Sequence, residues 1–131
     1  MNIEKAIIER WAAAPALAAL LPSERLTTGC SACAAPPYAT IEPVASRPML
    51  PTNAGNAIQR SVWRIHVWHA DYDALRAIAE QVETVMDRAE LARPGGLPPA
   101  RLQRIGSTTT QHDDGLWQWT VELQITMVFN P

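Results

Sequence analysis

A change of period between residues 57 and 89 constrains the fold more than any other feature. Apolar and polar side chains alternate in residues 57–69, and alternation places the two sets on opposite faces of a strand. One face carries Trp63, Ile65 and Val67, and the other carries Arg64, His66 and Trp68. From Tyr72 to Ala89 apolar residues recur every three or four positions, after Asp71 as an N-cap. The pattern predicts a half-buried strand that leads directly into an amphipathic helix.

The segments before this unit predict a second helix and a second strand. Residues 3–21 have near-helical apolar spacing. Pro15 lacks an amide hydrogen, so we expect this helix to break near Ala14 and restart with the proline in its first turn. Residues 38–46 alternate, and Pro43 indicates an edge strand or a bulge. We expect loops over residues 25–37 and 47–57.

The last third of the chain predicts a β-hairpin. Residues 93–100 are rich in glycine and proline and end the preceding helix. Residues 101–111 and 116–129 then alternate, and Asp113, Asp114 and Gly115 between them suit a tight turn.

The resulting order of elements is αββαββ, and two amphipathic helices can cover only one face of such a sheet. We therefore expect a two-layer α+β fold: a mainly antiparallel four-stranded sheet with two helices packed on one face. A length of 131 residues fits a single domain spanning residues 1–131.

Charge and hydropathy bear on the partners of the chain. The net charge is -2 and Lys and Arg are not clustered, so the footprint of a dedicated nucleic-acid binder is missing. The first residues carry charges where a signal peptide would be apolar, and no run approaches the ~18 apolar residues that span a membrane. We expect a protein made and kept in a cytoplasm, without a membrane partner.

Three groups of reactive side chains are candidate sites, and each has a simpler interpretation. Cys30 and Cys33 have the spacing of half a zinc site or of a redox pair, but a structural zinc site needs two further ligands. His66 and His69 would lie on opposite faces of a strand. The segment from His112 to Asp114 has the composition of a solvated turn. No catalytic motif occurs, so we expect no catalytic residue, no cofactor and no metal.

The five tryptophans are more informative. Four of them fall on faces assigned to the core, but Trp68 shares the polar face with Arg64 and His66, a composition typical of an interface anchor. The loop with Met49 and Leu50 offers a second patch. The candidate contact residues for a subunit or partner are Met49, Leu50, Arg64, His66 and Trp68.

The chain resembles the tail completion and tail terminator (head-tail joining) proteins of tailed bacteriophages along nearly its whole length. The resemblance lies in APALAALL at the end of the first helix, PY opening a strand, and WRIHVW running into DYDALRAIAEQV. An Asp-Gly hairpin before a long last strand completes it. The Cys-bearing insert departs from the pattern.

The resemblance implies a non-enzymatic virion subunit that assembles into a ring, commonly of six copies, in the tail or neck of a particle made in a bacterial cytoplasm. Such a ring caps the tail tube and joins it to the head connector proteins. Its partners are other copies, the tail tube protein and the connector, and DNA passes through without specific binding. The alternatives are a small α+β enzyme or ligand-binding domain and a module built on the two cysteines.

Overall fold

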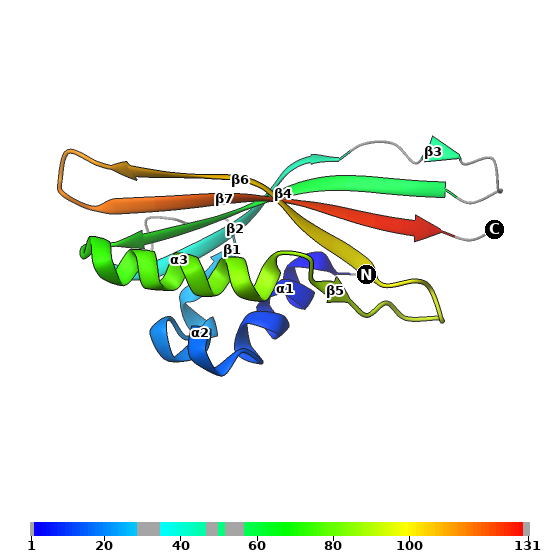
Figure 1. The fold of residues 1–131 in the computed structure, drawn as a ribbon, viewed down its shortest axis with the longest axis horizontal. Coiled ribbons are helices and arrows are strands. Elements are labelled where there is room, and N and C mark those ends of the chain that lie inside the picture. Colours follow the sequence, from blue (N-terminus) through cyan, green and yellow to red (C-terminus); the bar gives the residue numbers. More distant parts are fainter. Residues whose placement is uncertain (1, 29–34, 47–49, 52–56, 130–131) are drawn as a thin grey trace.

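Figure 1 shows the computed structural model of the chain, which describes residues 2–28, 35–46, 50–51 and 57–129. The helices are α1 (Ile3–Ala12), α2 (Pro15–Leu20) and α3 (Tyr72–Met86), with a 3₁₀ turn, η1 (Ser23–Arg25), after α2. The long strands are β2 (Tyr38–Ser46), β4 (Ala57–His69), β6 (Ala100–Gln111) and β7 (Trp117–Phe129). The short strands are β1 (Leu26–Thr28), β3 (Leu50–Pro51) and β5 (Glu90–Leu91).

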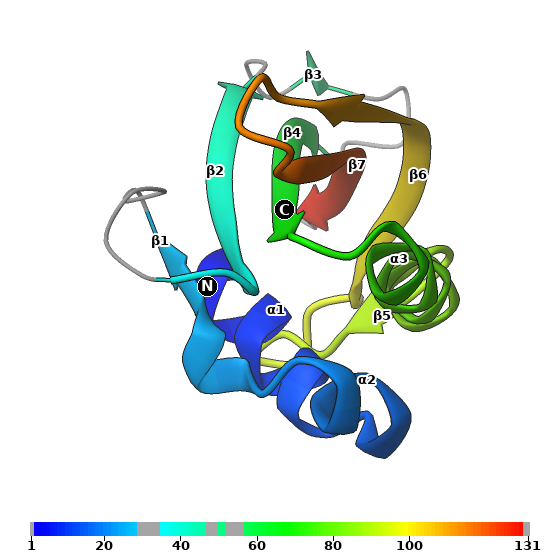
Figure 2. The ribbon, with the colours of Figure 1, turned by 90° about the vertical axis from the view of Figure 1, so that its left-hand side faces the viewer.

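Within the described residues these strands form one mixed sheet. Six of them follow the order β1-β2-β4-β7-β6-β5, and β3 pairs with the first residues of β4. All neighbours are antiparallel except β1 and β2, which are parallel. Figure 2 shows that the sheet is strongly curled, with β2 and β6 on either side of β4 and β7.

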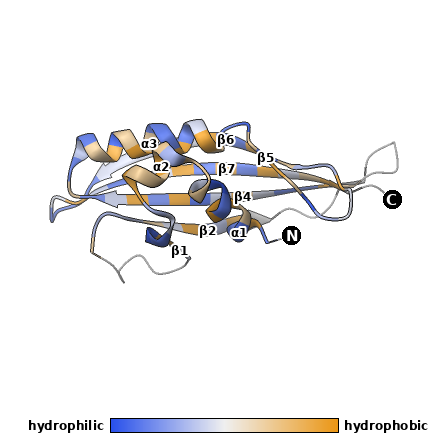
Figure 3. Cartoon of the chain, turned by 90° about the horizontal axis from the view of Figure 1, so that it is seen from below, coloured by the Kyte–Doolittle hydropathy of each residue, from blue (hydrophilic) through white to orange (hydrophobic). Residues whose placement is uncertain are grey.

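All three helices lie on the same side of the sheet (Figures 1 and 2). α3 turns one apolar stripe to the sheet, and β4 and β7 supply the facing side chains through strict alternation, visible as alternating colours in Figure 3. The buried residues of these three elements include Leu75, Ile78, Val82, Met86, Ile65, Val67, Trp119, Val121, Leu123 and Ile125. None of the described helices lies on the opposite face of the sheet.

Specific contacts define the ends of the first two helices and join α1 to Leu21 and to α3. Asn2 caps α1 by accepting from the backbone of Lys5, and Pro15 occupies the first turn of α2, where its missing N–H costs no hydrogen bond. The fully buried Trp11 donates its indole N–H to the Leu21 carbonyl over 2.8 Å, which fixes the corner between α1 and the residue after α2. Arg10 donates Nε to the Val85 carbonyl at the end of α3, over 2.7 Å.

The α+β class, the single helical face and the four long strands are confirmed, but the counts of strands and helices were wrong. β1, β3 and β5 contain two or three residues each, which is too short to produce a periodic pattern. The break before Pro15 is confirmed, and because it separates two helices the fold has three helices instead of two. Of the two expectations for Pro43, an edge position or a bulge, the structure shows a bulge, as a register shift between Pro43 and Ala45.

The helix expected to reach Ala89 ends three residues earlier, at Met86. Asp87 is extended and Arg88 adopts a positive φ of 60°, so the chain leaves the helix before Ala89, which is buried and accepts from the Leu102 amide. The apolar periodicity continued past the helix because Ala89 packs against the same core.

Arg88 provides a test of this helix end. A left-handed backbone costs a residue with a Cβ about 1 kcal/mol or more, whereas glycine adopts it freely. Arg88→Gly is therefore expected to raise the free energy of unfolding by about 1 kcal/mol in a urea titration. Arg76→Gly, in the interior of α3, is the control and is expected to lower it by a similar amount. A loss of stability in Arg88→Gly would contradict this description of the helix end.

Candidate interaction surface

We use the name open face for the face of the sheet on which no described helix lies. It carries three rows of paired residues. β2, β4 and β7 each contribute one residue to a row, because their registers run in step. The rows are Tyr38, Trp68 and Gln118; Thr40, His66 and Thr120; and Glu42, Arg64 and Glu122. Alternation along each strand directs these side chains away from the core. The open face therefore joins residues from three distant parts of the chain.

An aromatic pair occupies the first row. The rings of Trp68 and Tyr38 stack with centroids 4.9 Å apart and an angle of 25° between their planes, and the ring of His66 lies 5.4 Å from Trp68. Trp68 remains half-buried, but it leaves Tyr38 only 7% exposed. Burial raises the pKa of the Tyr38 hydroxyl above its usual value, and the Asp114 charge adds to the increase. Tyr38 is therefore a protonated, packed support for Trp68.

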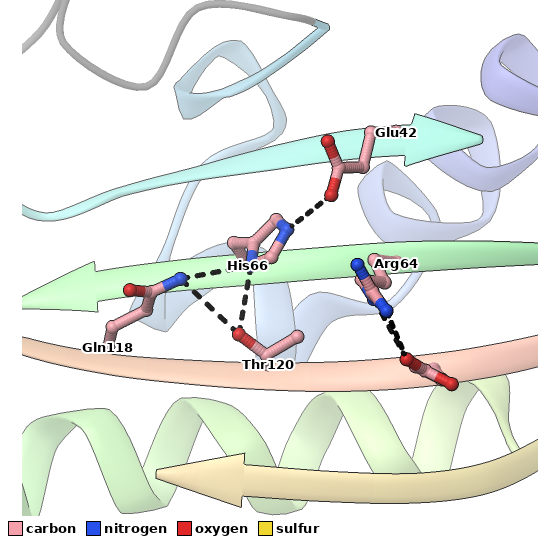
Figure 4. A network of polar contacts seen from close by, with 6 residues as sticks. Glu42, Arg64, His66, Gln118 and Thr120 are labelled. Atoms are coloured by element: carbon pink, nitrogen blue, oxygen red, sulfur yellow. Dashed lines mark hydrogen bonds and ion pairs between the residues drawn. The ribbon is translucent and has the colours of Figure 1, made fainter. Parts of the chain in front are cut away.

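A hydrogen-bond network fills the second row (Figure 4). His66 contacts Glu42 Oε1 through Nε2 over 2.8 Å, and its Nδ1 lies 2.8 Å from Thr120 Oγ1 and 3.0 Å from Gln118 Nε2. A glutamine amide nitrogen only donates, so Nδ1 accepts and Nε2 carries the proton that is donated to Glu42. His112 Nε2 in turn donates to Gln118 Oε1 over 2.7 Å. The network orients these side chains across three strands and the hairpin.

An ion pair forms the centre of the third row. Arg64 directs both Nε and one terminal nitrogen to Glu122 Oε1, each over 2.8 Å. Both side chains are more than a third exposed, so solvent screens the pair and its contribution to folding is small. Its main effect is to hold the guanidinium against Glu122, and Figure 4 shows the pair beside the histidine network.

The remaining reactive groups have structural roles in the part of the chain that the structure describes. His69 Nδ1 accepts from the Asp71 amide, and Asp71 caps α3. Asp114 accepts from the Leu116 amide and shapes the hairpin between β6 and β7. Across the described residues no group of three His, Cys, Asp or Glu side chains lies close enough to hold a metal ion. Cys30 and Cys33 lie outside them.

The structure places the predicted contact residues in two groups. Arg64, His66 and Trp68 lie together on the open face, as the alternation of β4 predicted. Met49 lies outside the described residues, and Leu50 begins β3, where its backbone pairs with Ile58.

Sequence reasoning missed the contributions of Tyr38 and Glu42 to this surface. Both lie in a strand that was predicted correctly, but which face of β2 joins which face of β4 depends on the register. No periodicity in either strand encodes that register.

No described helix has the length and apolar character needed to cross a lipid bilayer.

Taken together, these features define a small α+β domain whose sheet offers an aromatic and charged surface held by cross-strand pairs. This geometry is typical of a protein that acts by contact. The family comparison agrees with this class: residues 5–127 match the model of the family described as tail completion protein gp17. The chain belongs to this family, and it is therefore a structural component of a phage-like virion tail and not an enzyme.

A solved structure has the same fold. It is a chain of the virion of a native gene transfer agent particle, with a TM-score of 0.76 at 15% sequence identity. The match covers 95% of this chain and 93% of the other. No curated protein matches the sequence.

Proposed function

We propose that copies of this chain, six in number, form a ring. The ring caps the tail tube and joins it to the head connector. The observation that carries the proposal is the open face: a stacked aromatic pair and an ion pair on a sheet surface without helical cover, in a member of a tail completion family. The similar chain is part of a virion, which supports a place in a particle for this one. DNA passes through the ring without specific contacts.

The ring requires a heterologous interface, in which two different patches of each subunit meet head to tail around a closed rotation. Arg64, His66 and Trp68 form one patch in this proposal, and the segment with Met49 and Leu50 contributes to the other. Figure 1 shows the sheet extending beyond the helices at the end where β7 stops, so that end can reach a neighbour. The tail tube protein and the connector then meet the two rims of the ring.

Tail-tube polymerisation tests this function. Purified tube protein is assembled with and without the chain, and tube lengths and ends are measured by negative-stain microscopy. We expect shorter tubes with extra density at one end when the chain is present. Tubes that elongate to the same length, with bare ends, would contradict the capping function. A denatured sample of the same chain controls for the added protein.

A further inference from the structure

The row of Glu42, Arg64 and Glu122 continues into β6, where the residue paired with Glu122 is Gly106. A shallow hollow of about 240 Å³ lies at this point of the sheet. It is lined by Gly106, Ser107, Thr108, Thr120 and Glu122. The hollow therefore lies beside the ion pair that the open face already contains.

Gly106 leaves this space vacant at an irregularity of β6, where the register with β7 shifts between Arg104 and Gly106. Its φ lies outside the left-handed region, and a Cβ built on it meets no atom within 4 Å. Glycine inside a strand weakens the strand and often marks a bulge, as here, or the close approach of another group. A larger side chain would fit at this position in the isolated subunit, so the hollow is open to a group from outside that subunit.

The lining defines the chemistry that the hollow can accept. Threonine methyl groups and the glycine backbone can pack against methylene groups. Both contacts from Arg64 go to Glu122 Oε1, and Oε2 has no partner among the described residues. A carboxylate offers about four acceptor positions. An arginine matches this lining, because an aliphatic stem leads to a planar cation that binds carboxylates in bidentate geometry.

We propose that an arginine of a neighbouring copy of this chain inserts into the hollow at Gly106 and pairs with Glu122. The inference rests on the self-assembly proposed above and identifies one of its contacts. The chain supplies suitable cations, since three arginine side chains have no hydrogen bond or ion pair within the described parts of the structure: Arg60, Arg76 and Arg88. Charge complementarity thus favours a second copy as the source of the arginine.

Gly106→Val tests whether the hollow is used. Valine fills the space and suits a strand, so we expect an unchanged or higher melting temperature together with ring formation that is weaker by roughly tenfold or more. Gly106→Ala is expected to give a smaller loss. Gln103→Val, an exposed position three residues earlier on the same strand, is the matched control and should assemble like the natural chain. Full ring formation by Gly106→Val would overturn the proposal.

Charge-removing variants identify the occupant. Glu122→Gln and one of Arg60→Gln, Arg76→Gln or Arg88→Gln are expected to weaken assembly to a similar degree. The arginine variant that weakens assembly on its own should cause no further loss of assembly when it is combined with Gly106→Val. In that double variant the contact is already absent. If none of the three arginine variants weakens assembly, the inserted side chain does not come from a second copy and the proposal is wrong.

These results are separable from a failure of the proposed function. A natural chain that never forms rings at any concentration would contradict self-assembly itself. Rings that form normally in every variant would contradict only the use of the hollow.

Discussion

Replacing Trp11 by alanine is expected to lower the free energy of unfolding by about 3–5 kcal/mol, the range for a large aromatic side chain in a core. Trp11 is fully buried and is among the largest side chains in that state. Its removal leaves a cavity where α1 meets the core and also removes the donor to the Leu21 carbonyl. The loss can be measured by urea unfolding at a protein concentration low enough to keep the chain monomeric.

A matched pair of phenylalanine variants separates the hydrogen bond from the packing. Trp119 is also fully buried, but its indole N–H has no hydrogen-bond partner among the residues that the structure describes. Trp11→Phe and Trp119→Phe remove similar volumes, and only the first breaks a hydrogen bond and leaves an acceptor unpaired. Trp11→Phe should therefore cost about 1–3 kcal/mol more than Trp119→Phe. Equal losses would mean that the bond to Leu21 contributes little to the corner of α1.

The second large effect concerns assembly. Trp68→Ala is expected to weaken ring formation by roughly 30-fold or more, because truncation of an interface anchor costs ≥2 kcal/mol. The free energy of unfolding should fall by only about 1 kcal/mol, through loss of the stacking on Tyr38. Concentration-dependent light scattering measures the first quantity and urea unfolding measures the second. Trp68→Phe keeps a ring at the position and is expected to retain most of the assembly.

Trp63→Ala is the control on the opposite face of the same strand. Sequence reasoning assigned Trp63 to the core, and a fully buried tryptophan would cost 3–5 kcal/mol on truncation. The structure shows it only partly buried at the edge of the core, so we expect a loss of about 1.5–3 kcal/mol. Ring formation by Trp63→Ala should weaken only as much as its lower folding stability explains. If Trp63→Ala weakens assembly as much as Trp68→Ala, the contact face has been assigned to the wrong side of β4.

Local patterns predicted the long elements of this fold, because period and capping act over a few residues. The bounds of β2 and β4 agree with the segments 38–46 and 57–69, and the side of β4 that carries Trp68 was predicted correctly. β1 and β5 could not be predicted in this way. Each forms because it pairs with free backbone groups at the edge of a longer strand. Which backbone groups are free at an edge depends on the tertiary structure.

The candidate surface likewise has a part that local patterns predict and a part that depends on tertiary structure. Alternation in β4 placed Arg64, His66 and Trp68 together, because neighbours along one strand obey a local rule. The partners that complete the surface, Glu42 and Glu122, lie 22 or more residues away in the chain and meet β4 only through its register. The hollow at Gly106 was equally hidden, since its significance depends on Glu122 being opposite.

Light scattering after size exclusion, followed by negative-stain imaging of the peak, tests most directly whether this chain works by assembling with itself. At increasing concentration the account predicts a particle several times the 14.4 kDa mass of the chain, seen as closed rings of uniform diameter. A monomer of 14.4 kDa at every concentration, with no rings in the images, would contradict it.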